Sequence, residues 1–459
     1  MQLVQALRLG PLPRLGLVGA GGKTSAMFRL ARELAGQVSA SHGPVLVTTT
    51  THLAVEQLGY GDQHFILQEP GDAAKLERYL DEIVLPEVIV LSGPEGEAGR
   101  VAGLSDPVLQ VVRAMADKRR LPILVEADGS RRLPLKAPAS HEPALPSWTD
   151  TVLVVAGLSG LGQPLNPDWV HRSDLFGKLA GIAPGATITP EALAQVLISP
   201  KGGLKNIPPQ ARRIALLNQA STPERQAQAR ALAQAILPAY QAVIIAALSS
   251  VLAGGDEQDE TLAVHEQAVG VLLAAGGSQR LGRPKQLLEW RGEPFVRHAA
   301  RAALAAGLNP VVVVTGAYAA EVHKALAGLP LLFAHNPIWE AGQSSSLAAG
   351  LRQLPAETGA AIFLLSDQPQ VPPTLLRSLV DLHAHTLAPV VAPQAGGRRA
   401  NPVLFDRLTF PDLLALQGDT GGRALFSRYP VTWLPWHDSD LLLDVDTEAD
   451  YQRLLDRMP

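Results

Sequence analysis

The chain has 459 residues, which is too long for one ordinary hydrophobic core, so we expect two or three domains. Its formal net charge of −4 gives no overall attraction to nucleic acid or to an anionic membrane, so any phosphate-binding charge must be local. The absence of cysteine excludes disulfides, thiolate metal ligands and cysteine nucleophiles.

We expect no targeting segment at the start of the chain. Residues 1–10 lack the basic start and long apolar core of a signal peptide, and no apolar run reaches about 18 residues. We therefore expect a cytoplasmic protein that binds neither membrane nor nucleic acid.

Both halves of the chain alternate short β-branched runs with longer amphipathic stretches, which predicts two consecutive α/β domains with mainly parallel sheets. An acidic, glycine-containing segment indicates a linker, which gives domains 1–252 and 268–459 around a linker at 253–267. Ligands are expected at the carboxyl ends of the strands. The predicted strands are residues 15–18, 45–48, 88–91, 123–126, 151–155, 213–217 and 242–246 in the first domain, and 269–273, 311–315, 331–334, 361–365, 390–392 and 431–434 in the second.

A glycine loop follows the first strand and leads into a helical stretch at 25–35. Its expected nucleotide-binding residues are Gly19, Gly21, Gly22, Lys23 and Thr24. Glycines let backbone N–H groups approach phosphate oxygens, while the lysine holds phosphates and the threonine reaches Mg²⁺. The spacing departs from the strict phosphate-loop pattern, so a simple tight turn is the alternative. We expect this domain to bind ATP or GTP.

Acidic and basic residues follow the strand at 123–126. Asp128 is the candidate magnesium ligand there, with an Asp-Gly turn as the alternative. Arg131, Arg132 and Lys136 can bind a phosphate or form a solvated basic loop.

The second domain opens with a strand and a glycine loop that supplies two cations, Arg280 and Lys285, a layout that favours a nucleoside triphosphate. Ser344 and Ser345 can donate hydrogen bonds to base or phosphate, or cap a helix. The expected nucleotide-binding residues of the loop are Leu273, Ala274, Ala275, Gly276, Gly277 and Ser278.

Three carboxylates are candidate ligands for Mg²⁺ or Mn²⁺. Asp367 follows the strand at 361–365, with a turn aspartate before proline as the alternative. Asp444 and Asp446 point the same way in extended geometry, with a capping box before the last helix as the alternative. In the turn near residue 420, Arg423 can pair with an acceptor phosphate, with a plain surface turn as the alternative. Arg398 and Arg399 can also serve the anionic acceptor, but we slightly prefer the interpretation of a solvated basic pair.

The pattern L-A-A-G-x-S-x-R-x-G-x-x-K at 273–285 resembles the signature of the MocA/MobA-type nucleotidyltransferases, and the resemblance covers about residues 268–459. Ala274-Ala275-Gly276 is similar to the cytidylyl-transferring branch, since the guanylyl-transferring branch usually has Ala-Gly-Gly. Further matching motifs are Asn336-Pro337, Ser344-Ser345-Ser346-Leu347, Ser366-Asp367-Gln368-Pro369, Asn401-Pro402, Gly418-Asp419-Thr420-Gly421-Gly422-Arg423 and Asp444-Val445-Asp446-Thr447.

The resemblance implies a Rossmann-like fold and transfer of CMP from CTP to molybdopterin, giving molybdopterin cytosine dinucleotide and pyrophosphate. It implies Arg280, Lys285 and Asp367 as catalytic residues, and Asn401, Asp419 and Arg423 at the acceptor. The residues alone indicate only an NTP and an anionic acceptor. A sugar-phosphate nucleotidyltransferase and a non-catalytic cofactor carrier or insertion chaperone remain alternatives.

Residues 10–250 resemble the YqeC-like accessory proteins of selenium-dependent hydroxylases through the glycine loop, Glu126-Ala127-Asp128-Gly129-Ser130, His171-Arg172 and Lys201-Gly-Gly-Leu-Lys205. This implies a nucleotide-binding accessory domain in the maturation of a molybdenum hydroxylase, with the hydroxylase apoenzyme or its insertion chaperone as partner.

Overall fold

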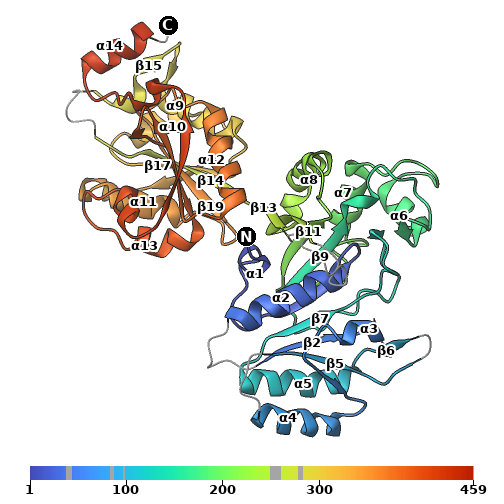
Figure 1. Ribbon diagram of the computed structural model, residues 1–459. Helices are drawn as coiled ribbons and strands as arrows, with labels where there is room; N and C mark the ends of the chain where they lie inside the picture. The colour runs from blue at the N-terminus through green and yellow to red at the C-terminus, as the bar shows by residue number, and fades with distance from the viewer. Residues whose placement is uncertain (38–43, 83–86, 97–98, 249–259, 278–282, 458–459) are drawn as a thin grey trace. The chain divides into compact units, whose positions relative to one another are not determined.

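The computed structural model describes residues 1–37, 44–82, 87–96, 99–248, 260–277 and 283–457. The chain divides into two compact units, Met1–His265 and Glu266–Pro459, each built around its own sheet (Figure 1). Both units are α/β with mainly parallel strands, so the predicted fold class is confirmed. None of the described helices is long and apolar enough to cross a membrane.

The described residues of the first unit form a nine-stranded sheet in the order β13-β12-β11-β9-β1-β7-β2-β5-β4. All neighbours from β12 to β4 are parallel. These strands are β1 (Arg14–Gly19), β2 (Val45–Thr49), β4 (Gln63–Ile66), β5 (Val88–Ser92), β7 (Ile123–Glu126), β9 (Thr151–Gly157), β11 (Arg212–Asn218), β12 (Ala242–Ala247) and β13 (Glu260–Glu266). Two small ribbons pair β3 (His52–Ala54) with β6 (Arg100–Ala102) and β8 (Leu135–Lys136) with β10 (Val170–His171).

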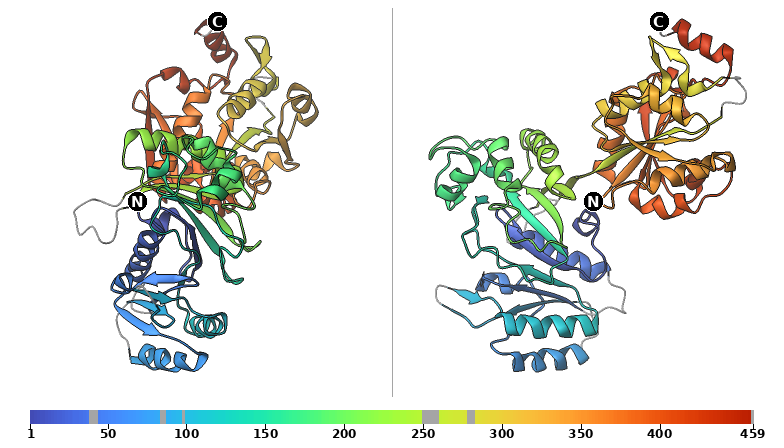
Figure 2. Two further views of the ribbon diagram at one scale, coloured as in Figure 1. Left: turned by 90° about the vertical axis from the view of Figure 1, so that its right-hand side faces the viewer. Right: turned by 180° about the vertical axis from the view of Figure 1, so that it is seen from behind.

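Helices cover both faces of this sheet, as Figure 2 shows for α2 on one side and α4 and α5 on the other. Leu76, Val108 and Val112 of the latter two helices pack on Ile89 of β5. The helices are α1 (Leu3–Ala6), α2 (Lys23–Gln37), α3 (Val55–Leu58), α4 (Ala73–Glu82), α5 (Asp106–Arg119), α6 (Ser173–Ala180), α7 (Pro190–Ile198) and α8 (Pro223–Ile236). This arrangement leaves the carboxyl ends of the parallel strands for loops.

The segment expected as a linker is partly a strand. Residues 253–259 of it lie outside the described residues, but Glu260–Glu266 form β13 beside β12. Thr261, Ala263 and Val264 are buried, which a solvated linker does not allow. Burial of these side chains against the sheet outweighs the acidic composition that suggested a linker.

The second unit has a sheet in the order β18-β17-β14-β19-β22-β20-β21 among its described residues, with β23 beside β20. β22 is antiparallel to both β19 and β20. The strands are β14 (Ala268–Ala274), β17 (Val311–Thr315), β18 (Leu332–His335), β19 (Ala360–Leu365), β20 (Val390–Ala395), β21 (Arg398–Arg399), β22 (Val403–Asp406) and β23 (Val431–Trp436). A ribbon of β15 (Glu289–Trp290) and β16 (Glu293–Pro294) lies outside this sheet.

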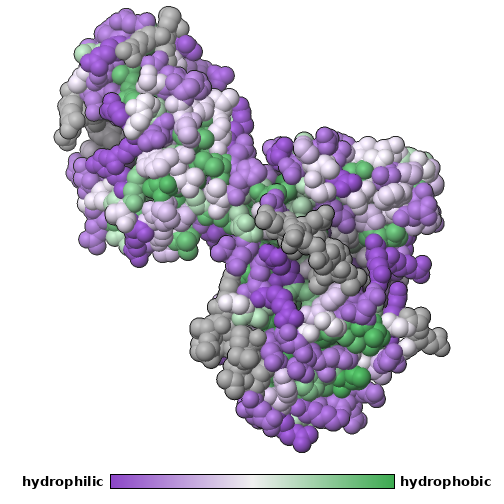
Figure 3. Space-filling model, viewed as in Figure 1, coloured by the Kyte–Doolittle hydropathy of each residue, from purple (hydrophilic) through white to green (hydrophobic). Residues whose placement is uncertain are grey.

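Two groups of helices sandwich this second sheet. Val296 of α9 and Leu375 and Leu379 of α12 pack on one face, and Leu347 of α11 and Leu413 of α13 pack on the other. The helices are α9 (Phe295–Ala305), α10 (Ala319–Ala325), α11 (Gln343–Leu351), α12 (Pro373–Thr386), α13 (Phe410–Leu414) and α14 (Glu448–Arg457). On the face of the molecule drawn in Figure 3, hydrophobic residues gather only in small patches on a mostly hydrophilic surface.

Candidate functional site

A cavity of about 320 Å³ opens at the carboxyl ends of β14 and β19 in the second unit. Its floor contains Ala275 and Gly276 from the loop after β14, and Asp367 from the turn after β19. The other lining residues are Leu273, Lys285, Gln286, Trp339, Gly342, Gln343, Ser346, Leu365, Ser366 and Asp419. We call this cavity the donor pocket, because the predicted nucleotide loop forms its wall.

The residues of the predicted nucleotide loop after β14 do not all line the donor pocket. Ala274 is buried at the end of β14, and Gly277 lines a neighbouring cavity of about 470 Å³ beyond Trp339. A Cβ atom on Gly277 would lie 2.7 Å from Cη2 of Trp339, so the glycine lets the indole pack on the loop. Ser278 and Arg280 lie outside the described residues.

Charge in the donor pocket centres on Asp367 and Lys285. Burial raises the pKa of Asp367 to about 6; Lys285 opposes this rise, whereas Asp444 and Asp446 add to it. Lys285 forms an ion pair with Asp446, and Asp444 accepts a hydrogen bond from Nε2 of Gln368. The segment of Asp367 and the segment of Asp444 and Asp446 therefore both lie near Lys285.

The arrangement fits a divalent ion that is shared with a substrate. No cluster of three potential ligands is found among the described residues, but Mg²⁺ commonly takes one or two carboxylates and completes its shell with phosphate and water. Asp367 can supply such a carboxylate from the pocket, with Asp444 on the adjoining side.

The serines at the start of α11 are engaged with the protein. Ser344 donates its hydroxyl hydrogen bond to the carbonyl of Gly418 at 2.7 Å, and Ser345 to the carbonyl of Gly342 at 2.8 Å. Neither residue lines the donor pocket, whereas Ser346 does. Sequence reasoning also missed Gln286, whose buried side chain donates to the carbonyl of Gly276 at 3.1 Å and holds the loop in place.

A second cavity of about 380 Å³ adjoins the donor pocket and shares Leu273, Gln343 and Leu365 with it. We call it the acceptor pocket. It collects the guanidinium groups of three exposed arginines, together with Asn401, Gln368 and Asp444 and an apolar wall. The arginines are Arg398, Arg399 and Arg423, and the aromatic wall residues are Phe363, Phe405 and Phe426. Arg398 and Arg399, interpreted as a solvated pair, thus lie beside Arg423, whereas Asp419 lines the donor pocket.

The glycine loop of the first unit has a backbone conformation that depends on its glycines. Gly19, Gly21 and Gly22 have φ angles of 98°, 81° and 126°, which other residues rarely adopt. Asn218 at the end of β11 donates to the carbonyl of Gly21 at 2.9 Å and accepts from the N–H of Leu248 at 2.9 Å. Its amide therefore braces the loop.

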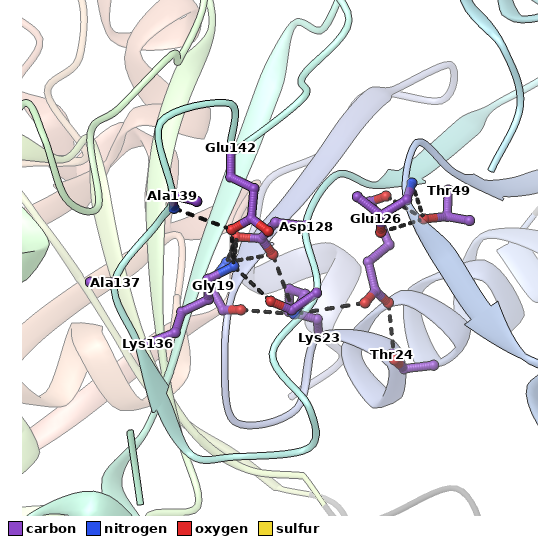
Figure 4. Close-up of polar contacts among 12 residues, drawn as sticks. Gly19, Lys23, Thr24, Thr49, Glu126, Asp128, Lys136, Ala137, Ala139 and Glu142 are labelled. Carbon is purple, nitrogen blue, oxygen red and sulfur yellow. Dashed lines mark hydrogen bonds and ion pairs between the residues drawn. The ribbon is translucent and has the colours of Figure 1, made fainter. Parts of the chain in front are cut away.

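Lys23 lies at the centre of a buried ionic network (Figure 4). Its Nζ donates to the carbonyl of Gly19 at 2.7 Å and lies 3.3 Å from Asp128 and 3.7 Å from Glu126. Burial lowers the pKa of Lys23, but Asp128 and Glu126 outweigh it, so the net shift is upward. Lys23 therefore stays protonated.

The carboxylate of Asp128 is engaged by the protein itself. Its carboxylate accepts from the N–H of Gly19 at 3.0 and 3.1 Å and from Lys136 at 2.8 Å, and it is 2% exposed. Glu126 instead faces the large cavity of this unit and accepts from the hydroxyl of Thr24 at 2.9 Å. The carboxylate and hydroxyl that face this cavity are thus those of Glu126 and Thr24, whereas Asp128 as a magnesium ligand stays a prediction.

Lys136 also belongs to the buried network and not to a phosphate site. It pairs with Glu142 at 2.8 Å, and Arg172 donates to the same carboxylate at 2.8 and 2.9 Å. Burial works to raise the pKa of Glu142, but the hydrogen bonds from Arg172 and Lys136 outweigh it and lower the pKa to about 2.

The glycine loop opens into a cavity of about 960 Å³. It is lined by Gly21, Gly22, Lys23, Thr24, Ser25, His52, Ala54, Val55, Glu56, Gln57, Tyr60, Gly99, Arg100, Glu126, Gly129, Ser130, Arg131, Arg132, Asn218, Gln219 and Leu248.

Comparison with known proteins gives two family matches. Residues 270–433 match the MobA-like NTP transferase domain, and residues 15–174 match the YqeC protein family. An Escherichia coli (strain K12) protein, named "Uncharacterized protein YqeC", is 34% identical over 209 residues, which cover 45% of this chain and 76% of the relative.

Several relatives match the second half. Nicotine blue oxidoreductase of Paenarthrobacter nicotinovorans is 34% identical over 197 residues, covering 40% of this chain and 95% of the relative. A Mycobacterium avium (strain 104) protein named "Probable molybdenum cofactor guanylyltransferase" is 30% identical over 193 residues, covering 41% of this chain and 95% of the relative.

Proposed function

We propose that this chain transfers CMP from CTP to the phosphate of molybdopterin. Its first half belongs to the YqeC family. Its second half belongs to the MobA-like NTP transferase family, which makes the chain a nucleotidyltransferase. The observation that carries this proposal is the meeting of two pockets at Leu273, Gln343 and Leu365, with Asp367 lining one pocket and its neighbour Gln368 lining the other. One pocket is bounded by the nucleotide loop and the other collects three arginines. A donor triphosphate and an anionic acceptor can therefore lie side by side.

The reaction asks the chain mainly for positioning and charge. An acceptor phosphate oxygen attacks the α-phosphorus of CTP, the bond from that phosphorus to the bridging oxygen breaks, and pyrophosphate leaves. Lys285 lies where it can neutralise phosphate charge, and the acceptor-pocket arginines hold the acceptor phosphate by bidentate hydrogen bonds. A divalent ion at Asp367 supplies further neutralisation of the α-phosphate when bound.

The acceptor and the nucleotide donor are each proposed from a different observation. The relative named as a guanylyltransferase favours a molybdenum cofactor as acceptor. The cytosine base rests on Ala274-Ala275-Gly276, which is similar to the cytidylyl-transferring branch.

For the first unit we propose binding of ATP or GTP, with Glu126 and Thr24 sharing Mg²⁺ with the phosphates. The two units together serve the maturation of a molybdenum hydroxylase in the cytoplasm, with the apoenzyme or its insertion chaperone as the expected partner. Fusion raises the local concentration of one activity beside the other.

The decisive measurement is Mg²⁺-dependent pyrophosphate release from CTP, GTP, ATP and UTP, each with and without molybdopterin. We expect release to require the pterin and to be fastest with CTP. Asp367→Asn should lower kcat at least 100-fold, whereas Asp381→Asn, an exposed position on α12, should match the wild type. Release with a sugar phosphate instead of the pterin would replace the acceptor, and CTP binding without any release would favour a carrier.

The acceptor pocket has its own test. Arg423→Ala should raise KM for the pterin at least tenfold and leave KM for CTP within twofold, because it removes one phosphate contact from the acceptor side only. Arg352→Ala, at an exposed position that lines neither pocket, is the matched control. Equal effects of the two substitutions would remove Arg423 from the acceptor site.

A further inference from the structure

The cavity of the first unit is much larger than the pocket proposed to bind a nucleotide in the second unit. Its volume of about 960 Å³ is three times that of the donor pocket, about 320 Å³, in the same molecule. The loop and the start of α2 contribute Gly21 to Ser25, while other lining residues come from the β3–β6 ribbon and the segment 129–132. The cavity thus has room for a ligand beside a nucleotide.

Charge is unevenly compensated around this cavity. Lys23 is neutralised by Asp128 and Glu126, and Arg132 forms an ion pair with Glu56. Arg100 and Arg131 are exposed and have no hydrogen-bonding or ion-pair partner for their side chains in the part of the chain that the structure describes. We call these two residues the arginine pair. Two uncompensated guanidinium groups lining one cavity favour an anionic ligand.

Arg131 is held close to the phosphate loop by its own segment. The N–H of Gly21 donates to the carbonyl of Leu133 at 3.1 Å, and the N–H of Leu133 donates to the carbonyl of Ser130 at 3.0 Å. Lys136 fastens the other end of this segment by donating to the carbonyl of Gly129 at 2.7 Å. Arg131 and Arg132 have φ angles of 52° and 63°, a left-handed conformation that side-chain-bearing residues adopt at a cost.

Besides burial, the positive charge of this segment lowers the pKa of the neighbouring His171. Burial lowers the pKa of His171 to about 4, and Arg172, Lys136 and Arg131 contribute to the fall.

Arg100 is fastened to the same region through the β3–β6 ribbon. It pairs with Ala54 across the ribbon, and the N–H of Gly103 donates to the carbonyl of Thr51 at 2.6 Å. Gln57, which follows the ribbon in α3, donates to the hydroxyl of Thr24 at 3.3 Å. The ribbon therefore connects Arg100 with the residue expected beside the metal.

We propose that the arginine pair binds a second, anionic small molecule of the phosphorylated class, next to the terminal phosphate of a nucleotide on the phosphate loop. The first unit is then a two-ligand site and not a simple nucleotide-binding module. This inference rests on the proposed nucleotide site of the first unit.

The test uses the full chain saturated with Mg²⁺ and AMP-PNP, and inorganic phosphate as the probe in equilibrium dialysis. Arg100→Ala/Arg131→Ala should bind phosphate at least tenfold more weakly than the wild type and AMP-PNP within threefold of it. Arg78→Ala/Arg230→Ala, at two exposed positions outside the cavity, should bind both like the wild type. Phosphate sites in the second unit are common to all variants and cancel in the comparison.

Three outcomes overturn an assignment. Unchanged phosphate binding in the arginine-pair variant removes the second-ligand site. Equal losses of affinity for phosphate and for AMP-PNP would assign the arginines to the nucleotide itself and would also overturn the second-ligand site. If Glu126→Gln and Thr24→Val leave the number of bound AMP-PNP molecules and their affinity unchanged, the nucleotide site fails instead, and phosphate titration without nucleotide then decides the arginine pair. Both arginines are exposed and neither is paired with another described residue, so thermal midpoints should match the wild type within about 2 °C.

Discussion

At the scale of single residues, the ionised carboxylate of Asp367 is expected to lower the stability of the fold, although the proposed reaction uses it. Its pKa of about 6 lies above its ordinary value of 3.8, so the fold favours the protonated form. Asp367 therefore contributes most to stability below pH 4, and this contribution is lost as the pH rises through 6. Without metal, Asp367→Asn should raise the free energy of unfolding of the second unit by about 1–3 kcal/mol at pH 8.

The comparison of pH values isolates this effect. The gain should shrink toward zero at pH 4, and Asp381→Asn should show no such dependence, as measured by urea unfolding of both variants and the wild type. A gain of equal size at pH 4 and pH 8 would contradict a cause in the ionised carboxylate.

Lys23 is expected to be structural as well as functional. Lys23→Met leaves Asp128 and Glu126 buried beside an apolar side chain, and removal of one partner from a buried ion pair costs about 3–5 kcal/mol. Lys23→Met/Asp128→Asn should recover part of this loss, because one buried negative charge is then removed as well. Denaturant unfolding of the single and double variants measures the coupling.

The same cycle separates two explanations for lost nucleotide binding. If the double variant is stable but does not bind nucleotide, the lysine acts on phosphate directly. If Lys23→Met alone is as stable as the wild type, the buried network is not what holds the loop.

At the scale of elements, the loop between β1 and α2 and the end of α2 give opposite responses to the same substitution. A Cβ atom on Gly19, at φ 98°, would collide with the carbonyl oxygen of Val155. Gly36 lies near the end of α2, is exposed and has open space around its Cα. Gly19→Ala should therefore destabilise the first unit by at least about 2 kcal/mol, and Gly36→Ala should stabilise it by about 0.5–1 kcal/mol.

Thermal unfolding of both variants checks this contrast. Equal effects would show that the loop shape is not fixed by the close approach of β9.

At the scale of the whole molecule, each unit has its own sheet and its own core clusters, so calorimetry of the full chain should show two unfolding transitions. A ligand stabilises the fold that it binds, by about 2.7 kcal/mol at a concentration 100 times its Kd. CTP with Mg²⁺ should therefore raise one transition, and this response should disappear in Asp367→Asn. ATP or GTP should raise the other, and Glu126→Gln should abolish that response. A single transition that all nucleotides raise equally would contradict separate sites.

Much of the fold could be predicted because its signals are local. Every predicted strand is present, and the buried runs at β2, β17 and β19 are continuous because helices cover both faces of each sheet. Two missed strands of the main sheets lack that signal, because β4 is partly exposed at the sheet edge and β13 begins in an acidic stretch. β22 was missed although its four residues are all buried.

The sequence by itself determined the two α/β units, the two glycine loops and the types of residue at the strand ends. Those features depend on side-chain periodicity and on glycine at defined backbone positions. Only the tertiary structure decided which carboxylate, serine or arginine faces a cavity.

Glu126 and Asp128 are two residues apart, and their roles are set by distant partners: Gly19 and Lys136 occupy Asp128, which leaves Glu126 toward the cavity. Likewise Gly418 engages Ser344, and the packing of β21 beside β20 brings Arg398 and Arg399 to Arg423. The contacts of Asp128 with Gly19 and of Ser344 with Gly418 join residues far apart in the chain, and no local pattern encodes them.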